Sequence, residues 1–111
     1  MVSHWCEQAK RELREVRIEG LVEHIRPGAD VWITFDIDCL DPAIAPGTGT
    51  PEPGGFTYYE ARALLRAVAR RARVIGMDLV EVNPLYDPGH LAALHGARLI
   101  LDTVGAVFER T

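Results

Sequence analysis

Two acidic residues, Asp36 and Asp38, stand where a strongly apolar stretch of the sequence ends. Residues 31–35 are all β-branched or aromatic, which is typical of a buried strand. Since side chains alternate along a strand, we expect both carboxylates to point to the same side of the sheet. Two like charges repel each other there unless a cation lies between them, and carboxylate oxygens suit Mg²⁺, Ca²⁺ or Mn²⁺. The spacing therefore predicts a metal site at Asp36 and Asp38.

A loop over residues 38–55, rich in proline and glycine, follows the two acids. Loops of such length inside a compact domain are usually functional or disordered. Three other interpretations compete with the metal site. A flexible linker leaves the acids unexplained. An EF-hand calcium loop needs glycine at its sixth position, where this sequence has Asp41. An aspartyl phosphotransferase normally needs a downstream lysine, whereas Lys10 lies upstream. A metal-dependent hydrolase fits the residues best.

The elements that must position the acids alternate between strand and helix. Apolar periodicity and capping signals predict a helix over residues 10–25, a helix over 57–71, a strand over 74–80 and a helix from 87 toward the C-terminus. A strand, a helix and a second strand at this spacing predict an α/β protein with a parallel βαβ unit. Because residues 74–80 are nearly all apolar, we expect that strand to be covered on both faces.

The end of the second predicted strand carries a third acid. Parallel sheets bind ligands at the carboxyl ends of their strands, and this rule places Glu81 beside Asp36 and Asp38. Three carboxylates at one sheet edge form a constellation that could carry chemistry. On the residues alone, Glu81 could equally be a solvated glutamate at a strand end without a function, and this alternative stays open. Asp78 lies inside the strand and needs a buried partner, so we interpret it as structural.

Composition excludes several classes of function. The 111 residues make one domain at most, and the 48% of hydrophobic residues suffice for a core. A net charge of -4 without a basic patch argues against nucleic acid as a partner. We expect no membrane segment, because no apolar run approaches the ~20 residues that span a bilayer. Cys6 and Cys39 do not form a metal or redox pair, and we expect a cytoplasmic protein.

The residues from Thr34 to Gly55, T-F-D-I-D-C-L-D-P-A-I-A-P-G-T-G-T-P-E-P-G-G, resemble the signature of the ureohydrolase family, the arginases, agmatinases and their relatives. The segment P-G-T-G-T-P-E-P-G-G is closer to agmatinases than to arginases. A second stretch, I-G-M-D-L-V-E-V-N-P-L-Y-D, resembles a family segment in the same order. The resemblance implies that residues 1–111 are the C-terminal part of a three-layer, parallel-sheet arginase-like fold, built on a βαβ unit with flanking helices.

The resemblance also implies a function. The family releases urea from guanidino compounds at a two-manganese centre, so we expect Mn²⁺ as cofactor and a small guanidino substrate, agmatine above all. Asp36 and Asp38 would hold manganese, and Glu81 would receive the substrate guanidinium through paired hydrogen bonds. Thr48 and Thr50 would donate hydrogen bonds in the substrate pocket, with mere stabilisation of the loop as the alternative.

Part of the family pattern has no counterpart in residues 1–30. The missing groups are one metal-binding His, an Asp-x-His-x-Asp cluster and a catalytic His. The chain thus resembles roughly the C-terminal third of a ureohydrolase and retains two of the six expected metal ligands. A fragment, a truncated gene product and one piece of an assembly all stay open, as does a catalytically inactive module. We expect a homo-oligomer, or pairing with the missing N-terminal part.

Overall fold

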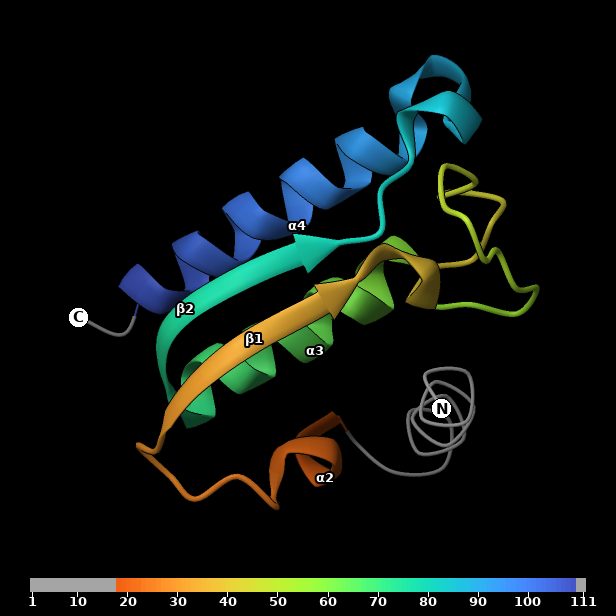
Figure 1. Ribbon diagram of the computed structural model, residues 1–111. Helices are drawn as coiled ribbons and strands as arrows, with labels where there is room; N and C mark the ends of the chain where they lie inside the picture. Colours follow the sequence, from red (N-terminus) through yellow and green to blue (C-terminus); the bar gives the residue numbers. More distant parts are fainter. Residues whose placement is uncertain (1–17, 110–111) are drawn as a thin grey trace.

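The computed structural model describes residues 18–109 and shows two parallel strands packed against two long helices (Figure 1). The helices and strands are α2 (Ile18–Val22), β1 (Asp30–Asp36), α3 (Tyr58–Arg71), β2 (Arg73–Val80) and α4 (Leu91–Phe108). Short 3₁₀ turns lie at Ile37–Cys39, Pro84–Tyr86 and Pro88–His90. β1 pairs with β2 in parallel, and α3 connects them, so the predicted βαβ unit is confirmed.

The helix α3 begins where the sequence predicts. The Thr57 hydroxyl accepts the backbone N–H of Glu60, and the Glu60 carboxylate accepts the backbone N–H of Thr57. This reciprocal cap satisfies two N–H groups that the first helical turn leaves unpaired, and such a cap contributes about 1 kcal/mol. Ala61, Leu65 and Ala69, spaced four residues apart, form the buried stripe of the helix.

The helix predicted over residues 10–25 ends earlier than expected. Residues before 18 lie outside the part of the chain that the structure describes, and α2 ends at Val22. The carbonyl groups of Glu23 and Ile25 accept hydrogen bonds from the Arg71 guanidinium at 3.2 and 2.7 Å. These carbonyls are therefore satisfied from the end of α3, and the segment adopts a turn there.

The core lies between one face of the sheet and both long helices. Phe35 of β1 belongs to the same buried cluster as Leu65 of α3 and Leu99 of α4. Gly96 lets α4 approach β2 closely, because a Cβ atom there would lie 3.1 Å from the Leu79 side chain. Both helices therefore cover the same face of the sheet.

The expectation that β2 is covered on both faces is wrong for the described part of the chain. Trp32 of β1 is 60% exposed, and Val80 of β2 is 37% exposed. The reason is the placement of α3 and α4 on a single face, which leaves residues 18–109 without an element to cover the other one. We call this uncovered side of β1 and β2 the open face.

The long loop after β1 is closed at its base. The Phe56 N–H donates to the Cys39 carbonyl, and the Asp41 N–H donates to the Phe56 carbonyl. The Asp41 carboxylate also accepts the backbone N–H groups of Gly54 and Gly55 at 3.1 and 3.2 Å. These bonds fix both ends of the loop against each other, which does not agree with a flexible linker.

Residues Pro88–Phe108 are, by length and composition, long and apolar enough to cross a membrane, contrary to the sequence expectation. That test does not separate a membrane span from a helix of a folded domain. Gly89 and His90 have left-handed backbone (φ 64° and 58°), so the continuous helix has 18 residues and a length of about 27 Å. Its Asp102 lies within 3.3 Å of Arg62 and accepts the Tyr58 hydroxyl of α3. In this structure α4 is an element of the α/β fold.

The base of the loop yields a stability prediction. A Cβ atom at Gly55 would lie 2.2–2.5 Å from backbone atoms of Leu40 and Asp41, which cannot move aside without breaking the closure. We expect Gly55→Ala to lower the free energy of unfolding by about 1–3 kcal/mol in urea denaturation. Gly49→Ala is the matched control, because nothing lies within 4 Å of its Cβ position. Equal stabilities of the two variants would contradict the close approach.

Candidate functional site

The two acids at the end of β1 lie together, but not for the reason the sequence suggests. The strand ends at Asp36, and Asp38 lies in the 3₁₀ turn Ile37–Cys39, so the argument from strand alternation is wrong. The Asp36 carboxylate instead caps this turn by accepting the Asp38 N–H at 3.0 Å. This 3₁₀ turn, which begins directly after Asp36, keeps the second acid beside the first.

The three predicted acids act on one another electrostatically. Burial raises the pKa of the Asp36 carboxyl above its ordinary value, although the hydrogen bond from the Asp38 N–H lowers it. The Asp38 carboxyl and the Glu81 charge raise that pKa further. Asp36 pairs with Val80 across the sheet, so Glu81 follows at the same sheet edge as Asp36 and Asp38, as the rule for strand ends predicts. Within residues 18–109, no three acidic, histidine or cysteine side chains are arranged closely enough to hold one metal ion.

Asp38 has one satisfied and one unsatisfied carboxylate oxygen. Its Oδ2 accepts the Thr50 hydroxyl at 2.8 Å. Its Oδ1 is buried and accepts no hydrogen bond from any described residue. A buried carboxylate oxygen without a donor is costly, because the water that it has lost is not replaced. This oxygen is therefore available to a ligand that supplies positive charge.

Glu81 follows directly on Val80, the last residue of β2, and has a left-handed backbone with φ 72°. Residues other than glycine rarely adopt this conformation, and strain of this kind persists where the surrounding structure enforces it, often at functional sites. Its side chain is exposed. The strained backbone turns the chain at the sheet edge where the two aspartates lie.

The middle of the loop is held against the region after β2. The Asn83 N–H donates to the Gly47 carbonyl at 2.8 Å, and a Cβ at Gly47 would lie 2.4 Å from the Asp87 side chain. Asp87 is 5% exposed, and its oxygens accept the N–H groups of Ala92 and Ala93 at the start of α4. The sequence marks Asp87 as a helix cap, but the contact with Gly47 carries no sequence signal that we recognised.

Two threonines of the loop differ in their surroundings. Thr50 donates to Asp38, whereas Thr48 is 2% exposed and its hydroxyl has no partner among the described residues. The role of Thr48 as a substrate contact stays a prediction. Asp78 does not have the buried partner that we expected. Its Oδ2 accepts the exposed Trp32 indole N–H at 2.8 Å and the Thr34 hydroxyl at 3.4 Å on the open face.

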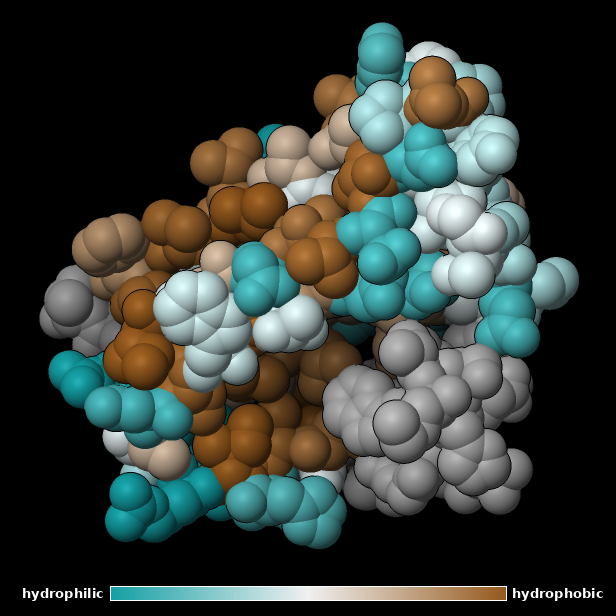
Figure 2. All heavy atoms as spheres, in the orientation of Figure 1, coloured by the Kyte–Doolittle hydropathy of each residue, from teal (hydrophilic) through white to brown (hydrophobic). Residues whose placement is uncertain are grey.

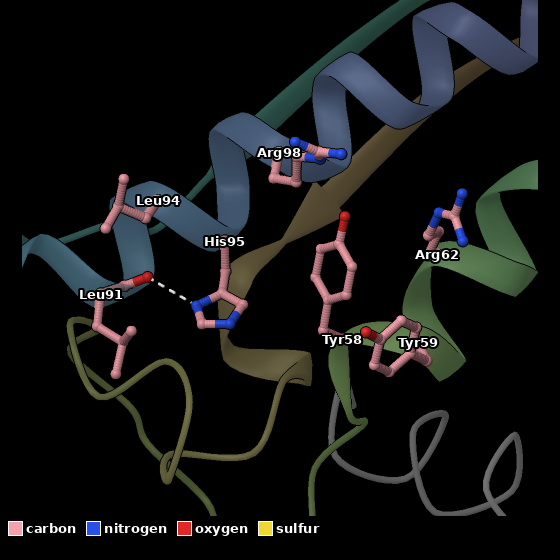
Figure 3. Close-up of a pocket in the computed structure, with 7 residues that line it drawn as sticks. All are labelled: Tyr58, Tyr59, Arg62, Leu91, Leu94, His95 and Arg98. Carbon is pink, nitrogen blue, oxygen red and sulfur yellow. Dashed lines mark hydrogen bonds between the residues drawn. The ribbon is translucent and has the colours of Figure 1, made fainter.

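A cavity of about 640 Å³ lies elsewhere, between α3 and α4 (Figure 3). It is lined by Tyr58, Tyr59, Arg62, Leu91, Leu94, His95 and Arg98. None of the three acids lines it, and the guanidinium groups of Arg62 on α3 and Arg98 on α4 repel cations. The His95 ring packs edge-on near Tyr58, with its Nδ1 2.8 Å from the Leu91 carbonyl oxygen, and so has a packing role. This cavity is not the predicted metal site.

A parallel βαβ unit with acidic residues at the ends of its strands defines an α/β protein. Residues 5–105 match the Arginase family, so the chain belongs to this family. It is 52% identical over 88 residues to the agmatinase of Proteus mirabilis, covering 77% of this chain and 28% of that protein. The agmatinase resemblance and the arginase-like fold class are thereby confirmed.

Two solved structures agree with this assignment. The proclavaminate amidino hydrolase of Streptomyces clavuligerus superposes with a TM-score of 0.77 at 37% identity, over 87% of this chain and 33% of its own. The arginase of Bacillus subtilis gives a TM-score of 0.78 at 27% identity, over 90% of this chain and 36% of its own. The chain thus spans only about a third of the length of these relatives, and less of the Proteus enzyme.

The pKa shifts at the two ends of β1 predict that substitution of Asp36 and of Asp30 has opposite effects on stability. The pKa of Asp36 is raised, so its charge opposes folding above that pKa, and this cost is absent below the unfolded value of about 3.8. We expect Asp36→Asn to raise the urea midpoint at pH 7 in EDTA, with a gain that disappears as the pH falls below 3.8.

Asp30 provides the matched control. Its hydrogen bonds with the Arg73 guanidinium hold its pKa below the ordinary value, so its contribution is present at neutral pH and is lost as the pH falls through the folded-state pKa. Asp30→Asn should therefore lower the urea midpoint at pH 7. A higher urea midpoint for both Asp36→Asn and Asp30→Asn, or for neither, would contradict the directions of the two pKa shifts.

Proposed function

We propose that this chain supplies part of a two-manganese ureohydrolase site that hydrolyses a guanidino compound, with agmatine as the preferred substrate. The supporting observation is the sheet edge where Asp36, Asp38 and Glu81 lie together. Membership of the Arginase family and the identity with an agmatinase support the reaction class and the substrate. We further propose a cytoplasmic location, on composition alone.

The chemistry of the aspartates fits manganese ligation. Both side chains offer oxygen donors, which manganese accepts readily. The buried Oδ1 of Asp38 accepts no hydrogen bond from the described residues, as expected of an atom that faces a cation. Thr50 holds the other oxygen of Asp38, and hydrogen bonds of this kind orient metal ligands. When bound, a pair of manganese ions lowers the pKa of water toward neutrality and so supplies the nucleophile for hydrolysis.

Glu81 is suited to hold the substrate rather than a metal. Its carboxylate is exposed at the same edge and can accept two parallel hydrogen bonds from a planar guanidinium. This pairing fixes both the charge and the orientation of the group to be cleaved, which is the main task of a substrate-positioning residue. Because the backbone of Glu81 is held in a strained conformation, its side chain starts from a fixed position beside the two aspartates.

The described residues alone do not complete this site. Two aspartates are too few to fix a pair of metal ions at the ~3.5–4 Å separation used in two-metal catalysis. A catalytically inactive module remains the second candidate, favoured by the lack of a complete ligand group within residues 18–109. The decisive material is a chimera in which this chain replaces its matching segment in the Proteus mirabilis agmatinase, with the isolated chain as an inactive control.

The metal assignment predicts a joint loss of metal and activity. We expect Asp38→Asn in the chimera to lower manganese occupancy and urea release together, because a neutral amide is a poor ligand for two cations. Metal analysis of the purified protein and a urea assay with agmatine measure the two effects. Asp30→Asn, at the far end of β1, should change neither. Full manganese occupancy in Asp38→Asn would show that Asp38 is not a metal ligand.

The substrate assignment predicts the opposite pattern at Glu81. We expect Glu81→Gln in the chimera to retain manganese but to lower kcat/KM at least about tenfold, because charge-assisted hydrogen bonds contribute ~1.5–3 kcal/mol each. Glu52→Gln, in the exposed part of the loop, should leave both quantities unchanged. Normal kinetics of Glu81→Gln would show that Glu81 is an ordinary solvated side chain without a role in substrate binding.

A further inference from the structure

The cavity of about 640 Å³ between the beginnings of α3 and α4 has a lining that suits a ligand of its own. Small-molecule sites typically have volumes of ~300–1,000 Å³. Tyr58 and Arg62 of α3 line one wall, and His95 and Arg98 of α4 line the other. Figure 3 shows Tyr58 and His95 directed into the space between the helices, with the two guanidinium groups flanking Tyr58. The cavity therefore combines aromatic rings with positive charge.

The charges around this cavity do not balance. The Asp102 carboxylate lies 3.3 Å from the Arg62 Nε and 3.6 Å from the Arg98 Nε, so one negative charge faces two guanidinium groups. Within residues 18–109, neither arginine forms an ion pair with another acid, and no acidic residue lines the cavity. Burial raises the pKa of the Tyr58 hydroxyl and Asp102 raises it further, against an opposite effect of Arg98, so this phenol adds no negative charge. One positive charge is left without a counterpart.

Two other arginines of the described chain are neutralised one to one. Arg66 of α3 pairs with Glu109 at 2.9 Å, and Arg73 of β2 pairs with Asp30 at 2.6 Å. The carboxylate of Asp102 differs from these partners, because it is shared between two cations at longer distances. Arginine does not lose its proton in proteins, so the excess charge at the cavity persists at every physiological pH. An anion is the ligand that balances it.

The two guanidinium groups retain donors for a carboxylate. Both ion pairs with Asp102 are made through Nε, whereas a guanidinium carries five N–H donors. The outer edge of a guanidinium donates two parallel hydrogen bonds to a carboxylate, which fixes the orientation of the bound group. The side chains of Arg62 and Arg98 are 39% and 69% exposed, so a ligand that enters the cavity can reach them.

The remaining lining of the cavity is apolar and exposed. Tyr59 is 74% exposed and Leu94 is 62% exposed, and both line the cavity. Farther along α4 the surface is apolar without charge. Figure 2 shows apolar atoms gathered along β2 and α4, and no charged side chain lines the groove between these two elements. A ligand that joins an apolar body to a negative charge therefore matches the cavity and not that groove.

We propose that the cavity between α3 and α4 binds a small organic monoanion, in which a carboxylate is attached to an aromatic or aliphatic body. The carboxylate pairs with Arg62 and Arg98, and the body covers the exposed side chains of Tyr59 and Leu94. A single excess positive charge suits a monoanion better than a phosphate dianion, and inorganic phosphate has no apolar part to cover the lining. The site prefers the opposite charge to the acidic sheet edge, so the inference does not depend on the proposed reaction.

The test titrates the 111-residue chain in EDTA with benzoate, with its neutral isostere benzamide and with inorganic phosphate, followed by ¹H–¹⁵N NMR. We expect benzoate to shift amide signals at the beginnings of α3 and α4. Benzamide and phosphate should bind at least about tenfold more weakly, because each lacks either the charge or the apolar body. Arg98→Gln should weaken benzoate binding at least about tenfold, whereas Arg66→Gln, in an ion pair outside the cavity, should not.

Circular dichroism checks that both variants fold, and Arg62→Gln takes the place of Arg98→Gln if the latter does not. Equal binding of benzoate and benzamide would overturn the proposal, and so would tighter binding of phosphate, equal effects of the two substitutions or an absence of benzoate binding. Benzoate-induced shifts outside the beginnings of α3 and α4 would also overturn it. Asp38→Asn should bind benzoate as the unaltered chain does, so the metal assignment and this proposal are tested separately.

Discussion

The partly buried carboxylate of Asp36, beside two further acids at the same sheet edge, is the constraint on which the account of this structure depends. Asp36 is partly desolvated and lies beside Asp38 and Glu81, so its ionised form is disfavoured in the folded chain. The charge of Asp36 therefore costs free energy in the folded chain as long as no counter-charge lies beside it. The arrangement makes physical sense when a cation and a cationic substrate supply that counter-charge.

The surrounding residues hold this unfavourable arrangement in place. Asp41 and Asp87 each accept backbone N–H groups on both carboxylate oxygens, so they close the loop and cap α4. Asp38 differs, since one of its oxygens has no donor among the described residues. Asp41 and Asp87 thus have structural roles with both oxygens occupied by backbone N–H donors, whereas Oδ1 of Asp38 is left available for a ligand.

The sequence predicted the parallel βαβ unit, the capped helix α3 and the convergence of the three acids. Those inferences rest on local signals, namely the Thr57–Glu60 capping box and the position of each acid at a strand end. The 3₁₀ turn at Asp38 was not predicted, because the two-residue spacing is equally compatible with a continuing strand. The exposure of Trp32 and Val80 was also missed, since apolar composition reveals that a face needs covering but not which segment covers it. The contact between Gly47 and Asp87 joins residues 40 positions apart and leaves no trace in local patterns.

The most direct test of the acidic edge uses the isolated chain and does not require a complete site. Mn²⁺ is paramagnetic and broadens the NMR signals of nearby nuclei, so substoichiometric Mn²⁺ can be added while the carboxyl ¹³C signals of the aspartates are recorded. If the edge is part of a metal centre, the signals of Asp36 and Asp38 broaden first, before those of Asp30 and Asp102. Uniform broadening of all four, or earlier broadening at Asp30, would contradict the account.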